Sequence, residues 1–283
     1  MGMPVSLTKT FAKVSEHAGS LAETTEKDPA SAAVQLDRVT KIYGATTAID
    51  DVSFAVHPGE VVVLLGRSGS GKTTIFRCIT RLAMVESGDI QVFGRSIHHL
   101  SRGELLEMRR SLGLIFQQFN LIGRLSSINN VLAGRLGHVS TLAAALRRFS
   151  TADRQRALAA LDRVGLLEKA YQRADSLSGG QQQRVAIARV LTQESRVILA
   201  DEPVASLDPK AAHTVLRILR EVAHERKLAV LCSLHQVDLA RAYADRIIGM
   251  SHGRVQFDIP AKRFSDEAMI SLYGRLTDDE EET

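Results

Sequence analysis

The fold is decided by Gly66-Arg-Ser-Gly-Ser-Gly71-Lys72-Thr73, which joins an apolar run to a segment of helical character. The run before it, Val61 to Leu65, is continuously apolar, as expected of a strand covered on both faces in a parallel sheet. The spacing G-x-x-x-x-G-K-S/T between a buried strand and a helix predicts a phosphate-binding loop. A glycine-rich turn without a ligand is the competing interpretation, and the position between strand and helix argues against it.

This loop offers the groups that a nucleotide polyphosphate requires. Its glycines let the backbone curl so that successive N–H groups face the phosphates, and the start of the following helix adds positive potential. We expect Lys72 to meet the β- and γ-phosphates and Thr73 to offer its hydroxyl to Mg²⁺. The predicted nucleotide contacts of the loop are Gly66, Ser68, Gly69, Ser70, Gly71, Lys72, Thr73 and Thr74.

Two carboxylates follow another apolar run. The strand predicted for Val197 to Ala200 ends in Asp201-Glu202-Pro203, so both acids lie at the carboxyl edge of a parallel sheet, where α/β folds bind ligands. We expect Asp201 to hold the Mg²⁺ shell and Glu202 to polarise the attacking water. An acid pair at the start of a helix is the competing interpretation.

A second helix start directed at an anion is predicted at Leu177-Ser-Gly-Gly-Gln181. Its serine can cap the helix, and a helix N-terminus attracts negative charge. One phosphate does not obviously need two such helix starts from one chain, and a coincidental helix cap is the alternative. With Gln182-Gln-Arg184 after it, the pentapeptide resembles the signature of the ATP-binding cassette family, and the resemblance runs from about Val34 to Gly274.

The resemblance implies an ATPase that binds ATP and Mg²⁺ between two subunits arranged head to tail. The signature of one subunit would complete the γ-phosphate site on the loop of the other through Ser178, Gly179, Gly180 and Gln181. By the same resemblance, Tyr43 stacks on adenine and Asp208 contacts the dimer partner. Gln117 senses the γ-phosphate and the permease, and His235 is the switch histidine. The implied catalytic residues are Glu202, His235, Gln117 and Lys72, and the implied metal ligands are Thr73, Gln117 and Asp201.

The whole pattern predicts an α/β fold, a P-loop NTPase cassette with a mostly parallel core sheet, an antiparallel β subdomain and an inserted helical subdomain. The alternation of Val52, Phe54 and Val56 suits a half-buried antiparallel strand. Leu105 to about Asp175 has helical character, with Thr151 as a predicted helix cap, so the helical subdomain is expected at about 104–176. We expect a flexible extension over 1–32, an ATPase domain over 33–274 and an acidic tail over 275–283.

Composition limits the other function classes. No apolar run approaches the roughly 20 residues of a membrane-spanning helix, and the N-terminus lacks the apolar core of a secretory signal. Cys78 and Cys232 lack metal-ligand spacing, which indicates a reduced, cytosolic compartment. The net charge of +4 could suggest nucleic acid, but tryptophan is absent and the arginines are not interleaved with aromatic residues, so no nucleic-acid partner is expected.

Several stretches resemble one branch of the family, the phosphonate import ATP-binding proteins. They are Phe119-Asn-Leu-Ile-Gly-Arg-Leu125, Ala133-Gly-Arg-Leu-Gly-His-Val-Ser-Thr141, Asp201-Glu-Pro-Val-Ala-Ser-Leu-Asp-Pro209 and Ser233-Leu-His-Gln-Val-Asp-Leu239. The branch implies a peripheral subunit at the cytoplasmic face of the inner membrane, working with an integral membrane permease and an extracytoplasmic solute-binding protein. The polar N-terminal extension and Ile259-Pro260 depart from the branch pattern.

Alternatives to phosphonate import remain open. Another small oxyanion or nutrient is compatible with the same ATPase, because cargo contacts belong to the permease and the binding protein. A soluble cassette protein of translation or DNA repair typically carries tandem cassettes or a long coiled-coil insertion, whereas this sequence shows one cassette with a short helical insertion. A non-catalytic regulatory cassette is disfavoured because Lys72, Asp201, Glu202 and His235 are all present.

Overall fold

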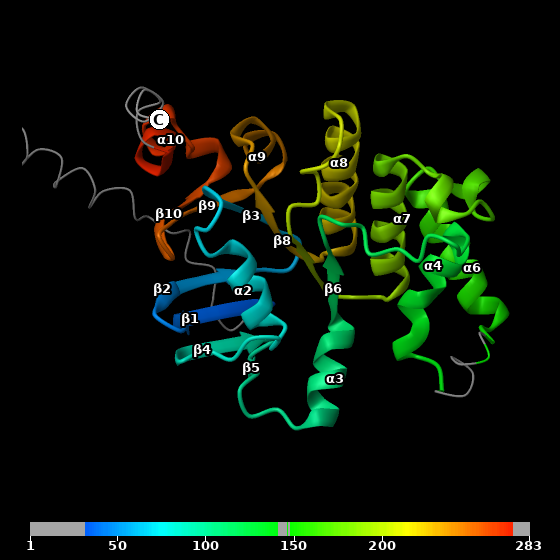
Figure 1. Cartoon of the computed structure of the whole chain (residues 1–283), viewed down its shortest axis with the longest axis horizontal. Helices are drawn as coiled ribbons and strands as arrows, with labels where there is room; N and C mark the ends of the chain where they lie inside the picture. Colours follow the sequence, from blue (N-terminus) through cyan, green and yellow to red (C-terminus); the bar gives the residue numbers. More distant parts are fainter. Residues whose placement is uncertain (1–31, 141–145, 147, 274–283) are drawn as a thin grey trace, which may run out of the picture.

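The computed structural model describes residues 32–140, 146 and 148–273, and within them the strands form two sheets (Figure 1). The smaller sheet has the order β2-β1-β4-β5 and is antiparallel. Its strands are β1 (Val34–Tyr43), β2 (Thr46–Val56), β4 (Ser87–Val92) and β5 (Arg95–Ser96). These residues confirm the predicted antiparallel β subdomain.

The core sheet has the order β10-β9-β3-β8-β7-β6, and only the β9–β10 hairpin in its described part is antiparallel. Its strands are β3 (Val61–Leu65), β6 (Leu112–Ile115), β7 (Val197–Ala200), β8 (Ala229–Leu234), β9 (Arg246–Ser251) and β10 (Arg254–Pro260). The predicted strands Val61 to Leu65 and Val197 to Ala200 are therefore confirmed at both ends.

Strand β3 shows why the apolar run is continuous. Val61, Val63 and Leu65 pack into the core on the side of the long helices, whereas Val62 and Leu64 pack into the core shared with the antiparallel sheet. Successive side chains of a strand point to opposite faces, so a strand with two covered faces needs an apolar residue at every position.

Helices cover the core sheet and extend beyond its β6 edge, where α4, α6 and α7 lie together (Figure 1). The α-helices are α2 (Lys72–Ile79), α3 (Arg102–Ser111), α4 (Ser127–Leu132), α6 (Thr151–Arg163), α7 (Gly179–Thr192), α8 (Pro209–Arg226), α9 (Val237–Tyr243) and α10 (Asp266–Tyr273). Short 3₁₀ turns are η2 (Ala133–Gly137), η3 (Leu167–Lys169), η4 (Ala174–Ser176) and η5 (Ala261–Arg263).

Two details of the predicted helical subdomain are wrong. Strand β6 lies inside the range 104–176 and belongs to the core sheet, so the helices of the insertion follow it. A β-carbon on Gly113 would lie 2.2 Å from Cγ1 of Val190, which shows how closely β6 approaches α7. The cap of α6 is Ser150 rather than Thr151, because the Ser150 hydroxyl accepts a hydrogen bond from the Asp153 N–H at 3.1 Å.

The predicted extension at 1–32 and the acidic tail at 275–283 fall outside the described residues, apart from Ala32. Among the helices that the structure describes, none combines the length and the apolar character needed to cross a membrane.

Candidate nucleotide site

The phosphate loop runs from the end of β3 to the start of α2, and neighbouring strands press against it. A β-carbon on Gly66 would lie 2.3 Å from the carbonyl oxygen of Met250 in β9. Gly71 has a φ of +102°, and a β-carbon there would lie 2.6 Å from the carbonyl oxygen of Ala48 in β2. Only glycine fits either position, so the curled backbone predicted for this loop has a steric cause.

Lys72 carries its positive charge into the loop. Its buried ammonium donates hydrogen bonds to the carbonyl oxygens of Gly66 at 2.7 Å and Arg67 at 2.9 Å. Burial lowers the pKa of Lys72, and the nearby negative charges of Glu202 and Asp201 oppose this. An anion placed in the loop would add a further charge partner for this ammonium.

The two carboxylates predicted from the sequence lie beside this loop. Asp201 follows β7, and its Oδ1 atom accepts a hydrogen bond from the Thr73 hydroxyl at 3.3 Å. Its Oδ1 atom also accepts one at 2.8 Å from the hydroxyl of Ser233, the penultimate residue of β8, which is the neighbour of β7 in the sheet. The Ser233 oxygen in turn accepts a hydrogen bond from the Glu202 N–H at 2.8 Å. One serine therefore fixes both acidic residues.

Glu202 and His235 form a close pair, with 2.5 Å between Oε1 of the glutamate and Nε2 of the histidine. Glu202 has a φ of +48°, in the left-handed region that a residue with a long side chain rarely adopts. Strained backbone of this kind persists where the surrounding structure holds it, and it clusters at functional sites. The Ser233 hydrogen bond to the Glu202 N–H supplies part of that hold.

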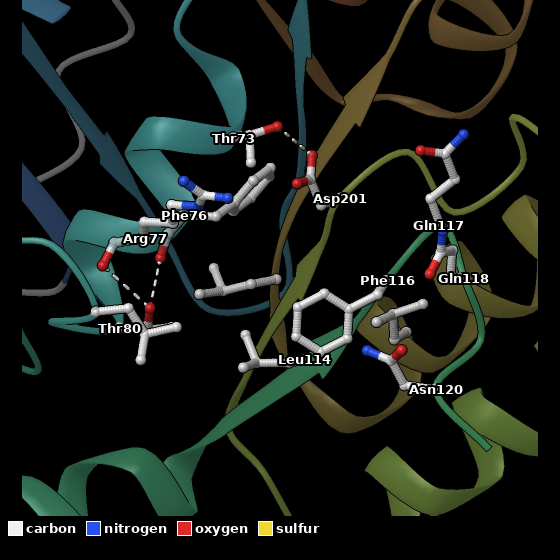
Figure 2. Close-up of a pocket in the computed structure, with 13 residues that line it drawn as sticks. Thr73, Phe76, Arg77, Thr80, Leu114, Phe116, Gln117, Gln118, Asn120 and Asp201 are labelled. Atoms are coloured by element: carbon white, nitrogen blue, oxygen red, sulfur yellow. Dashed lines mark hydrogen bonds between the residues drawn. The ribbon is translucent and has the colours of Figure 1, made fainter. Parts of the chain in front are cut away.

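Gln117 follows β6 and lines an open cavity of about 420 Å³ together with Thr73 and Asp201 (Figure 2). The cavity continues from these polar groups along α2 to Arg77 and Thr80. Apolar walls come from Phe76, Leu114, Ile115, Phe116 and Leu199. The structure thus brings the implied metal ligands to one cavity.

The signature segment begins α7, as predicted. The Ser178 hydroxyl accepts a hydrogen bond from the Gln181 N–H at 3.4 Å, and the Gln181 side chain accepts one from the Ser178 N–H at 3.1 Å. A second open cavity, of about 460 Å³, is lined by Ser178, Gly180, Gln181 and Asp208. Asp208 caps α8 by accepting a hydrogen bond from the Ala211 N–H at 2.9 Å.

The sequence model of the ABC transporter family matches residues 49–205, which include the phosphate loop, the signature segment and both acidic residues. The chain belongs to the ABC transporter family. This result confirms the predicted family, fold and ATPase class.

Three curated relatives of this cassette are import proteins. The Hypophosphite import ATP-binding protein HtxD of Stutzerimonas stutzeri is 48% identical over 85% of this chain and 71% of its own length. The Phosphonates import ATP-binding protein PhnC of Frankia casuarinae is 48% identical over 86% of this chain and 96% of its own length. The Phosphate-import ATP-binding protein PhnC of Mycolicibacterium smegmatis is 49% identical over 84% of this chain and 90% of its own length.

A solved structure of the family shows the same fold. A dimeric ATP-binding cassette in a post-hydrolysis state, bound to ADP and Pi, superposes with a TM-score of 0.71. It is 33% identical in sequence, and the match covers 82% of this chain and all of that one.

Tyr43, the predicted adenine-stacking residue of the cassette, lies at the end of β1 and is 42% exposed. The Lys41 ammonium lies 4.8 Å from the centroid of its ring. Tyr43 pairs with Thr46 at the hairpin to β2, and Ala48 of β2 lies against Gly71 of the phosphate loop. This hairpin therefore connects Tyr43 to the loop, and the contact of Tyr43 with a base stays a prediction.

The implied metal set fits a magnesium ion that arrives with a nucleotide. Within the described residues, no group of three or more His, Cys, Asp and Glu side chains could hold a metal ion. Mg²⁺ needs few protein ligands beside phosphates and water, and it prefers oxygen atoms. The Thr73 hydroxyl and the Asp201 carboxylate, 3.3 Å apart, provide oxygen atoms at the phosphate loop.

Two residues that position the site were missed from the sequence. Ser233 fixes both acids, as described above, and the buried Gln183 of α7 donates a hydrogen bond to the Pro203 carbonyl oxygen at 2.7 Å. The signal for Ser233 in the sequence was its place directly after the apolar run from Leu228 to Cys232. Gln183 lies in the glutamine run after the signature, and nothing in its spacing indicates a contact with the turn after Glu202.

Proposed function

We propose that this ABC cassette is the MgATP-hydrolysing subunit of an importer for phosphonate or a closely related phosphorus oxyanion. The observation that carries the ATPase part is the Glu202–His235 pair at 2.5 Å, next to an aspartate that shares Ser233 with Glu202. These groups come from two adjacent strands and face the loop that holds Lys72.

In this proposal Glu202 orients the attacking water, and His235 keeps the carboxylate in place through its Nε2 atom. Lys72 and the N–H groups of the loop bind the phosphates, and Thr73, Asp201 and Gln117 would hold Mg²⁺. The bound ion would neutralise charge on the phosphate oxygens. Phosphoryl transfer depends mainly on such positioning and charge stabilisation.

The exposed signature supports a composite site between two copies of the chain. Ser178, Gly180 and Gln181 line a surface with Asp208, and this surface lies at the start of α7, where a helix N-terminus attracts an anion. A second copy in head-to-tail orientation would place its γ-phosphate there. Tyr43 would stack on the adenine of the nucleotide bound to its own loop.

The cavity beneath Gln117 is the surface we assign to the permease. A large apolar side chain is exposed at this cavity, since Leu82 lines it and is 66% exposed. An apolar segment of a membrane protein that docks here would contact the residues around Gln117. The subunit would then bind peripherally at the cytoplasmic face of the inner membrane, with a solute-binding protein on the other side.

The cargo proposal rests on the relatives. Their names give hypophosphite, phosphonates and phosphate at nearly equal identity to this chain, and all three are phosphorus oxyanions. We favour phosphonate because the stretches quoted above resemble that branch.

Growth on single phosphorus sources tests the cargo. A strain without this gene and without a paralogue should fail to grow on a phosphonate and still grow on phosphate. Wild-type chain should restore growth, and Lys72→Ala should not. If the deletion strain grew on phosphonate and failed to grow on hypophosphite, the cargo would be hypophosphite and the phosphonate proposal would be wrong.

Purified protein tests the ATPase separately. Hydrolysis should require Mg²⁺ and disappear in Lys72→Ala. If the wild-type protein bound ATP and never hydrolysed it, with or without its permease, the ATPase proposal would be wrong.

A further inference from the structure

The chain after Gln117 adopts an unusual backbone conformation. Phe119 has a φ of +22° and Asn120 a φ of +49°, so two consecutive residues other than glycine lie in or near the left-handed region. A bulky residue rarely adopts a positive φ. A turn of this kind persists when neighbouring groups hold it in place.

Arg189 of α7 provides such a hold. One of its terminal nitrogens, NH1, donates a hydrogen bond to the Asn120 carbonyl oxygen at 2.6 Å, and NH2 donates one to the Phe119 carbonyl oxygen at 3.3 Å. Burial lowers the pKa of Arg189, and no carboxylate of the described residues offsets this effect. A half-buried guanidinium whose described partners are two carbonyl groups depends on those carbonyls.

The same segment also touches the signature. A β-carbon added at Gly179 would lie 3.5 Å from Cζ of Phe119, so the phenyl ring packs against the first residue of α7. Helical side chains lean toward the helix N-terminus, which lets Arg189 reach back to the carbonyl group of that phenylalanine. Phe119 is therefore held to α7 at two places along the helix.

We propose that Arg189 is a positioning residue that fastens the segment after Gln117 to the signature helix, so that Gln117 and the Ser178–Gln181 segment move as one unit. Contact of a permease near Gln117 would thereby reach the signature that faces the partner subunit. The inference about coupling rests on the proposed function, whereas the fastening itself does not.

Hydrogen exchange of the full-length protein tests the fastening. In Arg189→Met, backbone amides of residues 119–121 should exchange about tenfold faster, because charge-assisted hydrogen bonds that hold the turn are gone. Arg189→Lys should fall between the wild type and Arg189→Met, because an ammonium keeps the charge and part of the bonding. The Lys variant also keeps the test possible if Arg189→Met does not fold.

Arg184 offers a matched control on the same helix. Its NH1 atom donates a hydrogen bond at 3.0 Å to the Val164 carbonyl oxygen, so it is also an arginine bound to a backbone oxygen. Arg184→Met should speed exchange near Val164 and leave residues 119–121 unchanged. Unchanged exchange at 119–121 in both Arg189 variants would overturn the proposal.

ATP turnover as a function of Mg²⁺ concentration tests the coupling. Arg189→Met and Gln117→Ala should each raise the Mg²⁺ concentration that gives half-maximal turnover. The double variant should be no worse than Gln117→Ala alone, because both changes act through one group, whereas Arg184→Met should add its own effect. Additive effects of Arg189→Met and Gln117→Ala would refute the coupling. Absence of MgATP hydrolysis in the wild type would refute the proposed function, and the exchange experiment would still decide the fastening.

Discussion

Two stretches of this cassette stand out in the sequence, and the fold uses them in opposite ways. The stretch Gly66–Thr73 leaves charged and polar groups at the open edge of the core sheet, where Lys72, Thr73 and Asp201 face a possible ligand. The stretch Ala133–His138, which carries part of the resemblance to phosphonate importers, serves packing. A β-carbon on Gly134 would lie 2.3 Å from the Arg189 carbonyl oxygen.

The charged residue of the second stretch is satisfied inside the protein. Arg135 is buried, and its Nε atom donates to Asp153 at 2.9 Å while its NH1 atom donates to Glu194 at 2.8 Å. His138 bonds to the Gln193 carbonyl oxygen at 3.0 Å. These contacts join η2 and α6 to the end of α7, so this part of the branch resemblance reflects how the helical insertion packs.

The largest expected effect is on activity, at the acidic pair that lies beside the first stretch. Glu202→Gln should reduce ATP turnover by about 10² to 10⁴, which is the usual contribution of a general base, and leave MgATP binding intact. Since ATP would then persist in the site, the variant should shift from monomer to dimer when MgATP is added, as measured by light scattering.

A second change makes that result specific to the composite site. Ser178→Arg in the Glu202→Gln background places bulk and charge on the surface that faces the partner, and should abolish the shift. A Gln variant that binds MgATP and stays monomeric at every concentration, with and without a permease, would exclude the head-to-tail arrangement.

The sequence predicted the elements whose local pattern matches their surroundings. Strands β3 and β7 are covered on both faces, so their residues form continuous apolar runs with sharp ends. Strand β6 was missed because Leu112-Gly-Leu-Ile is a short run directly after a helix, and its pairing with β7 is a tertiary fact. The residues expected to contact phosphate and metal could be predicted, because each lies in a local sequence motif. Ser233 and Arg189 were not predicted, because the roles of these two residues depend on which chain segments become neighbours.

The next effect is on stability and belongs to the second stretch. Arg135→Ala leaves Asp153 buried without its main charge partner, so the free energy of unfolding should fall by roughly 3 to 5 kcal/mol. Urea unfolding at neutral pH measures it. Arg163→Ala is the control, because its bridge to the half-exposed Glu221 and the exposed Glu225 should contribute about 1 kcal/mol or less. If Arg135→Ala and Arg163→Ala lowered the free energy of unfolding equally, the burial of Arg135 would not explain its contribution to stability.

A smaller effect is expected on the affinity for ATP when Tyr43 is changed. Base stacking on an aromatic ring is worth about 1 to 3 kcal/mol in nucleic-acid binders, so Tyr43→Ala should weaken ATP binding by a comparable amount. Tyr43→Phe and Tyr43→Trp should largely preserve it. Calorimetry in the Glu202→Gln background measures binding without turnover, and unchanged affinity in the Ala variant would show that another group holds the base.

The smallest effect is the dependence of folding stability on pH. Its sign at Asp153, the ion-pair partner of Arg135, is opposite to its sign at Lys72 of the phosphate loop. A hydrogen bond from Ser150 and the charge of Arg135 lower the pKa of Asp153. An acid whose pKa is lower in the folded state stabilises the fold above its unfolded pKa, near 3.9, and this contribution is lost as pH falls through the folded pKa. Burial lowers the pKa of Lys72, so its charged form costs stability at neutral pH, and the cost fades as pH rises through the folded pKa.

Two substitutions test these signs, with the free energy of unfolding measured by urea denaturation at several pH values. Asp153→Asn should destabilise the protein at pH 7. Its difference from the wild type should start to shrink as pH falls below about 3.9, where the carboxylate of the unfolded chain takes up its proton, and should vanish once pH has fallen through the lower pKa of the folded state. Lys72→Met should stabilise the protein at pH 7, because it removes a buried charge that serves nucleotide binding rather than folding. If Lys72→Met were destabilising, the phosphate loop would depend on its lysine for structure, and the contrast between a loop kept for its ligand and an insertion kept for its packing would fail.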